Sequence, residues 1–129
     1  MADGNFIGLI GLGVMGQNLA LNIARKGYSV SVYNRTASRT EAFLTERVRN
    51  EPITPAYDLQ TFVQSLARPR KVILMVQAGA AVDAMIDSLI PLLDSRDLII
   101  DMGNSHYADT ERRMENLAAR GLLFLGTGV

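Results

Sequence analysis

The sequence has no cysteine and one histidine, His106, among its 129 residues. Without cysteine the chain cannot form a disulfide, a thiolate metal site or a cysteine nucleophile. A single histidine also excludes a metal site built from several histidines, so we expect no metal ion. No apolar run approaches the roughly 20 residues that span a bilayer. Residues 1–5 carry an acid where a secretory signal has basic residues. We therefore expect a cytoplasmic protein that does not insert into a membrane.

The sequence also lacks an excess of charge of either sign. Thirteen basic and thirteen acidic side chains cancel. Binding to nucleic acid or to an anionic membrane surface needs a basic excess to meet the phosphates, so the balance argues against both partners. A content of 48% hydrophobic and 20% charged residues is typical of a globular protein. The length suits a single domain, residues 1–129.

Short apolar segments alternate with helical patterns along the chain. Strands are predicted at residues 6–10, 29–33, 53–56, 71–76, 98–100 and 122–125. Helices are predicted at residues 14–26, 38 to about 48, 59–66, 80 to about 93, and from a cap at Asp109 to residue 120. This alternation indicates an α/β fold, a Rossmann-type doubly wound parallel sheet of about six strands with helices on both faces. In the strand order 3-2-1-4-5-6 the third strand lies at an edge, which suits its Pro55.

Local patterns predict several details of the helices. Ser38, with a glutamate three residues later, predicts a capping box that opens the second helix. Asp58 predicts the N-cap of the third helix. In the first helix Met15, Leu19 and Ile23 recur every four residues and predict its buried face. The six methionines are scattered, which is typical of core residues.

Three glycines predict a phosphate-binding turn. Gly11, Gly13 and Gly16 form the pattern G-x-G-x-x-G directly after the first strand and at the start of the first helix. Gly11 permits a tight turn, Gly13 lets the backbone approach a pyrophosphate, and Gly16 lets the helix pack closely on the strand. The free N–H groups at the helix start favour an anion. The alternative is a glycine-rich turn without a ligand, but the flanking strand and helix favour dinucleotide binding.

The residues after the second strand favour NADP over NAD. A site for NAD has an acid there, about 20 residues after the glycines, which accepts from the ribose 2′-hydroxyl. This sequence has Asn34, Arg35 and Thr36 instead, all of which can donate to a 2′-phosphate. Arg39 lies one helical turn further and adds positive charge. The alternative for Arg35 is a solvated cation in a loop.

Four segments resemble a known family. Residues 11–22, GLGVMGQNLALN, and 33–36, YNRT, resemble the β-hydroxyacid dehydrogenase superfamily. Residues 74–79, LMVQAG, and 99–113, IIDMGNSHYADTERR, are similar to 6-phosphogluconate dehydrogenase. The resemblance implies NADP-dependent oxidative decarboxylation of 6-phosphogluconate to ribulose 5-phosphate, part of the pentose phosphate pathway. It also implies a homodimeric enzyme.

The resemblance assigns the site residues. Those expected to bind the cofactor are Gly11, Leu12, Gly13, Val14, Met15, Gly16, Asn34, Arg35, Thr36, Val76, Gln77, Ala78 and Asn104. Asn104 is expected to touch the substrate as well. The sequence departs from the family pattern at three positions: Gly13 stands for the usual alanine, Gln77 for a lysine and Met102 for a glycine.

The resemblance also places the chemistry of the family outside this sequence. Residues 126–129 resemble the segment that leads into a Ser-Gly-Gly substrate loop, and the family's catalytic lysine and glutamate belong to a helical domain that this sequence does not contain. We therefore expect no catalytic residue in this chain, and no activity from it alone. The alternatives are a non-catalytic NADP-binding module or a domain of a related β-hydroxyacid dehydrogenase. Residues 122–125, at an edge with an apolar face partly open, predict self-association.

Four further polar residues could carry chemistry. His106 could be a general base, but a loop histidine is more often simply solvated. Asp101 could act as an acid, although an aspartate there more often ends the strand or caps the turn. Arg112 and Arg113 lie among glutamates in a mixed polar segment, which predicts a helix face that points to water.

Overall fold

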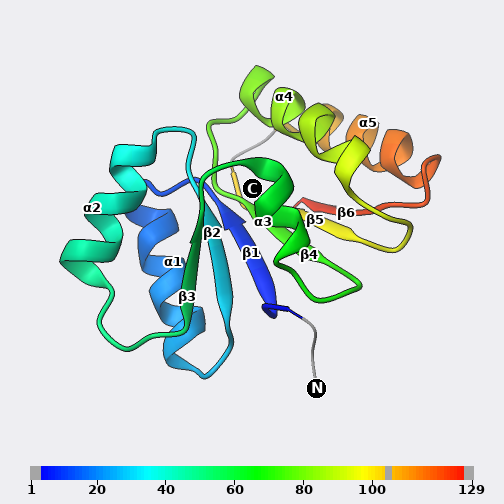
Figure 1. The fold of residues 1–129 in the computed structure, drawn as a ribbon. Helices are drawn as coiled ribbons and strands as arrows, with labels where there is room; N and C mark the ends of the chain where they lie inside the picture. The colour runs from blue at the N-terminus through cyan, green and yellow to red at the C-terminus, as the bar shows by residue number, and fades with distance from the viewer. Residues whose placement is uncertain (1–3, 104–105, 127–129) are drawn as a thin grey trace.

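Six parallel strands form one sheet in a computed structural model that describes residues 4–103 and 106–126 (Figure 1). The strand order is β3-β2-β1-β4-β5-β6, as predicted, and every neighbouring pair is parallel. The strands are β1 (Ile7–Ile10), β2 (Val30–Tyr33), β3 (Ile53–Ala56), β4 (Lys71–Leu74), β5 (Leu98–Asp101) and β6 (Leu123–Gly126). The predicted doubly wound α/β fold is therefore confirmed.

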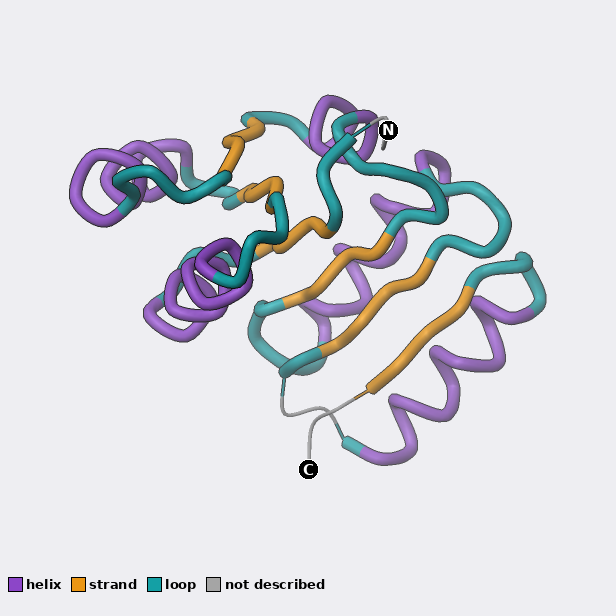
Figure 2. Tube along the Cα trace, turned by 90° about the horizontal axis from the view of Figure 1, so that it is seen from below, coloured by secondary structure: helices purple, strands orange, loops and turns teal. Residues whose placement is uncertain are grey.

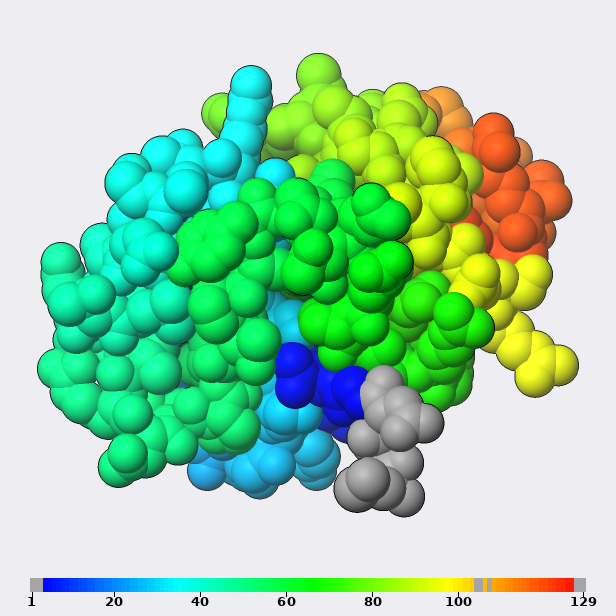
Figure 3. Space-filling view, in the orientation of Figure 1, coloured from blue at the N-terminus to red at the C-terminus, as the bar shows by residue number. Residues whose placement is uncertain are grey.

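The helices cover both faces of the sheet (Figure 2). They are α1 (Val14–Arg25), α2 (Ala37–Arg47), α3 (Leu59–Gln64), α4 (Ala80–Leu89), the 3₁₀ turn η1 (Ile90–Leu92) and α5 (Tyr107–Ala118). Helices α1 and α2 pack in one core cluster, and α3, α4 and α5 pack in the other. Neighbouring strand residues alternate between the clusters, as Leu9 and Ile10 do, because successive side chains point to opposite faces. In the space-filling view the green segment with β3 and α3 lies across the front of the molecule (Figure 3).

Two local predictions are confirmed at the third strand and helix. Pro55 lies opposite Val32 in β3, which is an edge strand, so its missing N–H interrupts no central ladder. Asp58 caps α3, since its Oδ1 accepts from the backbone N–H of Thr61 at 2.8 Å. That hydrogen bond is the largest cause of a lowered pKa of the Asp58 carboxyl.

Two predicted caps are wrong. Helix α2 begins at Ala37 after Thr36, so Ser38 lies inside the first turn, and Glu41 accepts instead from the Tyr57 hydroxyl at 2.8 Å. Helix α5 has His106 as its N-cap, and the His106 Nδ1 accepts from the backbone N–H of Ala108 at 3.3 Å. Asp109 therefore lies in the first turn of α5 rather than at its cap. The N-cap of α2 is thus Thr36, two residues before the predicted one, and the N-cap of α5 is His106, three residues before the predicted one.

The predictions for the methionines are confirmed only in part. Met75 and Met85 are partly buried against the two core clusters, whereas Met102 and Met114 are exposed. Met15 is 73% exposed, and the residues of α1 that are buried are Gly16, Ala20, Leu21 and Ala24. Leu19 and Ile23 are partly buried against the same core cluster. Of the methionines in the described part of the chain, none is buried. Three of the four buried residues of α1 are small, which lets α1 lie close to the sheet, whereas the long Met15 side chain points away from the core.

Neither a membrane span nor a metal cluster is found in the part of the chain that the structure describes. Among residues 4–103 and 106–126, no helix has the length and hydropathy to cross a bilayer. The same residues include no group of three or more histidine, aspartate or glutamate side chains placed to hold a metal ion.

Candidate functional site

The glycine turn lies where β1 and β4 meet, at the point where the strand order reverses. In sheets of this kind ligands bind in the crevice outside the carboxyl ends of the strands at this point. Gly11 has a φ of +106°, and a Cβ there would overlap the carbonyl oxygen of Met75. A Cβ on Gly16 would overlap the carbonyl oxygen of Gly11. Backbone packing therefore leaves no room for a side chain at Gly11 or Gly16, which agrees with the tight turn and the close helix packing predicted for them.

The third glycine and the start of α1 face open space. Gly13 is the N-cap of α1, has no side-chain cap, and a Cβ on it would meet nothing within 4 Å. The first N–H groups of a helix have no partner within the helix, and here no acidic side chain occupies the first turn. Val14 and Met15 are exposed beside them. This helix start can therefore accept an anionic group.

Two cavities flank the glycine turn. One has a volume of about 510 Å³ and lies between the end of β2 and α4; its lining includes Tyr33, Asn34, Arg35, Val76 and Met85. The other has a volume of about 420 Å³ and lies on the β5 side. Its lining residues are Gly13, Val14, Met15, Gly16, Met75, Val76, Met102 and Gly103. Two largely apolar hollows on either side of an anion-binding turn match a ligand with two ring systems joined by phosphates.

Asn34 supports the glycine turn directly. Its Oδ1 accepts from the backbone N–H of Leu12 at 2.8 Å, and its Nδ2 donates to the carbonyl oxygen of Thr36 at 3.2 Å. The Leu12 side chain is fully buried, so that residue offers only its backbone to a ligand. The prediction treated Asn34 as a donor to a phosphate, whereas the structure ties its amide to two backbone groups.

The cations after β2 are accessible. Arg35, Thr36 and Arg39 are exposed at the start of α2. Within the described residues neither Arg35 nor Arg39 has an ion-pair partner. The nearest residues in the sequence include no acid before Glu41, which binds Tyr57. The end of β2 therefore carries an uncompensated positive charge.

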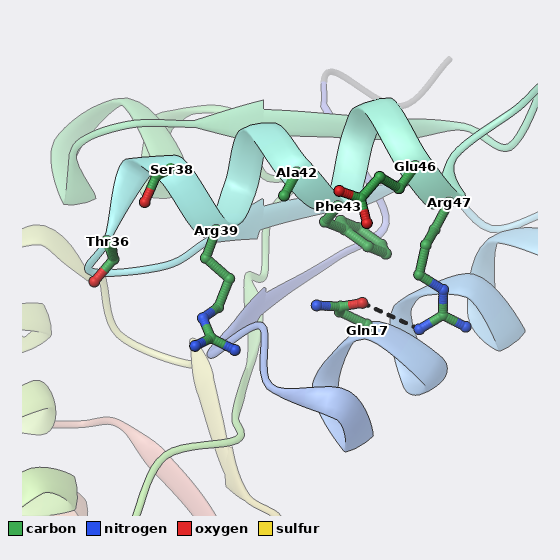
Figure 4. Close-up of a pocket in the computed structure, with 8 residues that line it drawn as sticks. All are labelled: Gln17, Thr36, Ser38, Arg39, Ala42, Phe43, Glu46 and Arg47. Carbon is green, nitrogen blue, oxygen red and sulfur yellow. Dashed lines mark hydrogen bonds between the residues drawn. The ribbon is translucent and has the colours of Figure 1, made fainter.

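A third cavity of about 320 Å³ lies between α1 and α2 (Figure 4). Arg47 of α2 donates to the Oε1 of Gln17 at 3.1 Å and to the Oδ1 of Asn18 at 2.9 Å. Gln17 in turn donates to the carbonyl oxygen of Leu12 at 3.0 Å. In the close-up Arg39 extends from the start of α2 toward this region. The chain of hydrogen bonds connects α2 to the glycine turn, a role for Gln17 and Arg47 that sequence patterns did not reveal.

Two further turns complete the site at the ends of β4 and β5. Val76 is half-buried, Gln77 and Ala78 are exposed, and Gly79 is the N-cap of α4, with a φ of +91°. After β5 the buried Asp101 accepts from the backbone N–H of Gly103 at 2.9 Å, so it ends the strand and caps the turn. Met102 is exposed at the cavity on the β5 side. Asn104 lies outside the described residues.

The prediction for Arg113 is wrong. Its side chain is 2% exposed, and its Nε donates to the Oδ1 of Asp83 at 2.8 Å. This hydrogen bond is the largest cause of a lowered pKa of the Asp83 carboxyl. Arg112, which also binds Asp83, is exposed as predicted. Thirty residues separate Asp83 from Arg113, so no local pattern could have indicated their contact.

Comparisons with known proteins give a consistent result. A family model described as the NAD binding domain of 6-phosphogluconate dehydrogenase matches residues 6–129. The decarboxylating 6-phosphogluconate dehydrogenase of Synechococcus elongatus is 60% identical over 122 residues, which are 95% of this chain and 26% of that protein. Two such enzymes of Bacillus subtilis, named as NADP-dependent and NAD-dependent, are 55% and 53% identical. The chain spans about a quarter of the length of these relatives.

Solved structures show the same likeness. A Plasmodium falciparum 6-phosphogluconate dehydrogenase, studied with NADP⁺ and with 6-phosphogluconate, superposes with a TM-score of 0.89 at 42% identity. The match covers 96% of this chain and 27% of that one. A 3-hydroxyisobutyrate dehydrogenase of Mycobacterium tuberculosis matches with a TM-score of 0.81 at 19% identity, which shows the shared fold alone.

Proposed function

Because the chain belongs to the family of NAD-binding domains of 6-phosphogluconate dehydrogenase, we propose that residues 1–129 bind NADP as the cofactor domain of such an enzyme. The enzyme's reaction is the oxidative decarboxylation of 6-phosphogluconate to ribulose 5-phosphate. The catalytic acid and base belong to a helical domain outside these residues.

The observation that carries the choice of NADP is the charge at the end of β2. Arg35 and Arg39 are exposed there, and neither forms an ion pair with another described residue, so a 2′-phosphate would gain charge-assisted hydrogen bonds. Identity to relatives does not decide between the cofactors, since the two Bacillus subtilis enzymes differ by 2% in identity to this chain, 55% less 53%. The local charge favours NADP.

The site fits the remaining parts of the dinucleotide as well. The first N–H groups of α1 would hold the pyrophosphate, since a Cβ on Gly13 would meet only open space. The cavity beside Tyr33 and Arg35 would hold the adenosine half, and the cavity beside Met75 would hold the nicotinamide half. When bound, the nicotinamide supplies the acceptor for the hydride that the substrate loses. The chain's own residues hold and orient it.

Residues 76–78 line the cofactor, and Asn104 contacts both cofactor and substrate. In this proposal 6-phosphogluconate is the substrate of the longer protein, which is a homodimer in the cytoplasm. The complexes named for the Plasmodium falciparum structure support the substrate. A residue of this chain that orients both ligands would control the distance between them, which governs the rate of transfer.

Calorimetric titration of NADP⁺ and NAD⁺ tests the cofactor choice. We expect the unchanged chain to bind NADP⁺ more tightly. Arg35→Ala should lower the affinity for NADP⁺ about ten- to a hundredfold, since a charge-assisted hydrogen bond contributes about 1.5–3 kcal/mol. Raising the salt concentration should lower the affinity for NADP⁺ more than the affinity for NAD⁺. The double variant Asn34→Asp with Arg35→Ala should narrow or reverse the preference, because a carboxylate repels the 2′-phosphate yet can still accept from Leu12.

Arg120→Ala is the matched control, because Arg120 is an exposed arginine just after α5, outside the residues that line the cavities. It should leave both affinities unchanged. The end of β2 is not a 2′-phosphate site if the unchanged chain binds the two cofactors equally. The same conclusion follows if Arg35→Ala leaves the ratio of the NADP⁺ and NAD⁺ affinities unchanged.

A further inference from the structure

Arg113 is a buried cation at the centre of three elements. It belongs to α5, yet its guanidinium donates to both carboxylate oxygens of Asp83 in α4, at 2.8 and 3.2 Å. A second terminal nitrogen lies 3.9 Å from the Oδ2 of Asp101, at the end of β5. The guanidinium also donates to the carbonyl oxygen of Gly79 at 3.2 Å. One side chain therefore contacts α4, the turn before α4 and the end of β5.

The groups that Arg113 holds define two turns of the candidate site. Gly79 closes residues 76–79, and its φ of +91° sets the direction in which the chain enters α4. Asp101 opens residues 101–103, and its other oxygen accepts from Gly103 at 2.9 Å. Met102 and Gly103 from these turns line the cavity on the β5 side, and Val76 lies between the two cavities and lines both. The position of both turns thus depends on the same guanidinium.

Arg112 provides an internal comparison. It also donates to Asp83, at 3.1 Å, but its side chain is 56% exposed, and it forms a second ion pair with Asp109 in the same helix. An exposed ion pair of this kind contributes little, because water and salt screen it. The Arg113 side chain is 2% exposed and its contacts with Asp83 are partly buried, so water and salt screen them less.

We propose that Arg113 is a positioning residue of the cofactor site. It fixes residues 76–79 and 101–103 relative to each other, so that the nicotinamide half of the dinucleotide meets a preformed surface. Rigid support of this kind raises affinity because less freedom is lost on binding. The inference rests on the proposed binding of NADP. It adds a residue that touches no ligand and acts through Gly79 and Asp101.

The test compares a whole dinucleotide with its adenosine half. Adenosine 2′,5′-bisphosphate would use Arg35 and the end of β2, which Arg113 does not contact. The helix that borders this half, α4, is also held by its buried Val82, Ile86 and Leu89. Arg113→Lys keeps the buried charge but cannot bind Asp83 and Gly79 with one planar group. We expect this variant to bind NADP⁺ about tenfold more weakly. Its affinity for adenosine 2′,5′-bisphosphate should stay nearly unchanged.

Arg112→Lys is the matched control and should leave both affinities unchanged. If Arg113→Lys does not fold, as judged by thermal unfolding, Asp83→Asn provides a second route. The Asp83 side chain is partly exposed, and the substitution weakens the shortest contact of Arg113. Asp83→Asn should likewise lower the affinity for NADP⁺ and leave the affinity for adenosine 2′,5′-bisphosphate nearly unchanged.

The outcomes separate this inference from the proposed function. Equal losses for the two ligands would overturn the inference, because a general structural role weakens both. Unchanged NADP⁺ affinity in Arg113→Lys would overturn it as well. If the unchanged chain binds neither ligand, the proposed function fails and the inference fails with it.

Discussion

Gly16 and Gly13 belong to the same turn but differ in what surrounds them. A Cβ on Gly16 would overlap the backbone carbonyl of Gly11, whereas one on Gly13 would meet no atom within 4 Å. We predict that Gly16→Ala lowers the free energy of unfolding by about 1–3 kcal/mol, because backbone must shift to admit the methyl group. Gly13→Ala should leave it unchanged or slightly raised, since alanine restricts the unfolded chain.

Urea unfolding of the two variants measures these differences directly. A loss of stability in Gly13→Ala as large as that in Gly16→Ala would contradict the geometry of the turn.

Asp83 makes the stability depend on pH. The hydrogen bond from Arg113, aided by Arg112 and opposed by partial burial, lowers the pKa of the Asp83 carboxyl below its usual 3.8. A group with a lowered folded pKa stabilises the protein fully above the unfolded value and loses that contribution as the pH falls through the folded value. We therefore predict that Asp83→Asn destabilises the chain at neutral pH, and that the difference shrinks below pH 3.8.

Urea unfolding across this pH range provides the measurement. Ser88→Ala, an exposed change in the same helix that alters no titratable group, serves as the control and should show no such dependence. If the effect of Asp83→Asn stays constant from neutral to acid pH, the ion pair with Arg113 is not its cause.

At the scale of the elements, the two edge strands of the sheet differ. The prediction of an open apolar face at β6 is confirmed, since Leu123 is 55% exposed and Leu125 is 51% exposed. They lie opposite Leu98 and Ile100 of β5 and so share one face with them. Edge strand β3 carries Pro55, which discourages pairing with another strand, whereas β6 has no proline.

We predict that the chain self-associates through β6 at high concentration, because an exposed apolar edge favours strand pairing. Light scattering over a concentration series should show a rising mean mass, and Leu125→Lys should suppress the rise. Ser88→Lys, an exposed position on α4, is a control for added charge. A strictly monomeric species at millimolar concentration would contradict the prediction.

At the scale of the whole molecule, the two side chains that could transfer a proton, His106 and Asp101, make structural contacts. His106 accepts a backbone hydrogen bond at the start of α5, and Asp101 is buried with its carboxylate on Gly103 and near Arg113. Both side chains therefore make structural hydrogen bonds. A general acid or base has a different task, because it must lie within hydrogen-bond reach of the proton that is transferred.

We predict that the 129-residue chain has no measurable 6-phosphogluconate dehydrogenase activity, although it binds NADP⁺. Substrate-dependent formation of reduced nicotinamide is followed by absorbance, and calorimetry on the same sample verifies cofactor binding. Joining the helical region of a relative should restore turnover. Substrate-dependent reduction by the rigorously purified chain would refute the prediction and place a catalytic group within these residues.

The sequence by itself determined the fold and the place of the glycine turn after the first strand. The alternation of strands and helices, Pro55 at an edge and Asp58 at a helix start are local signals, because they depend on residues within a few positions of each other. The glycine spacing after β1 is local as well, and the structure places Gly11 and Gly16 in the packing that this spacing requires.

The tertiary structure alone decided which side chains are buried and what they bind. The residues next to Arg113 in the sequence are typical of a solvated helix face. The side chain is nevertheless buried, because the fold places Asp83 and Asp101, from distant segments, beside it. Met15 fits an apolar helical period, yet it is exposed because α1 packs on the sheet through small residues. A buried charge depends on partners brought together by the whole fold. No period or spacing within one element could have identified them.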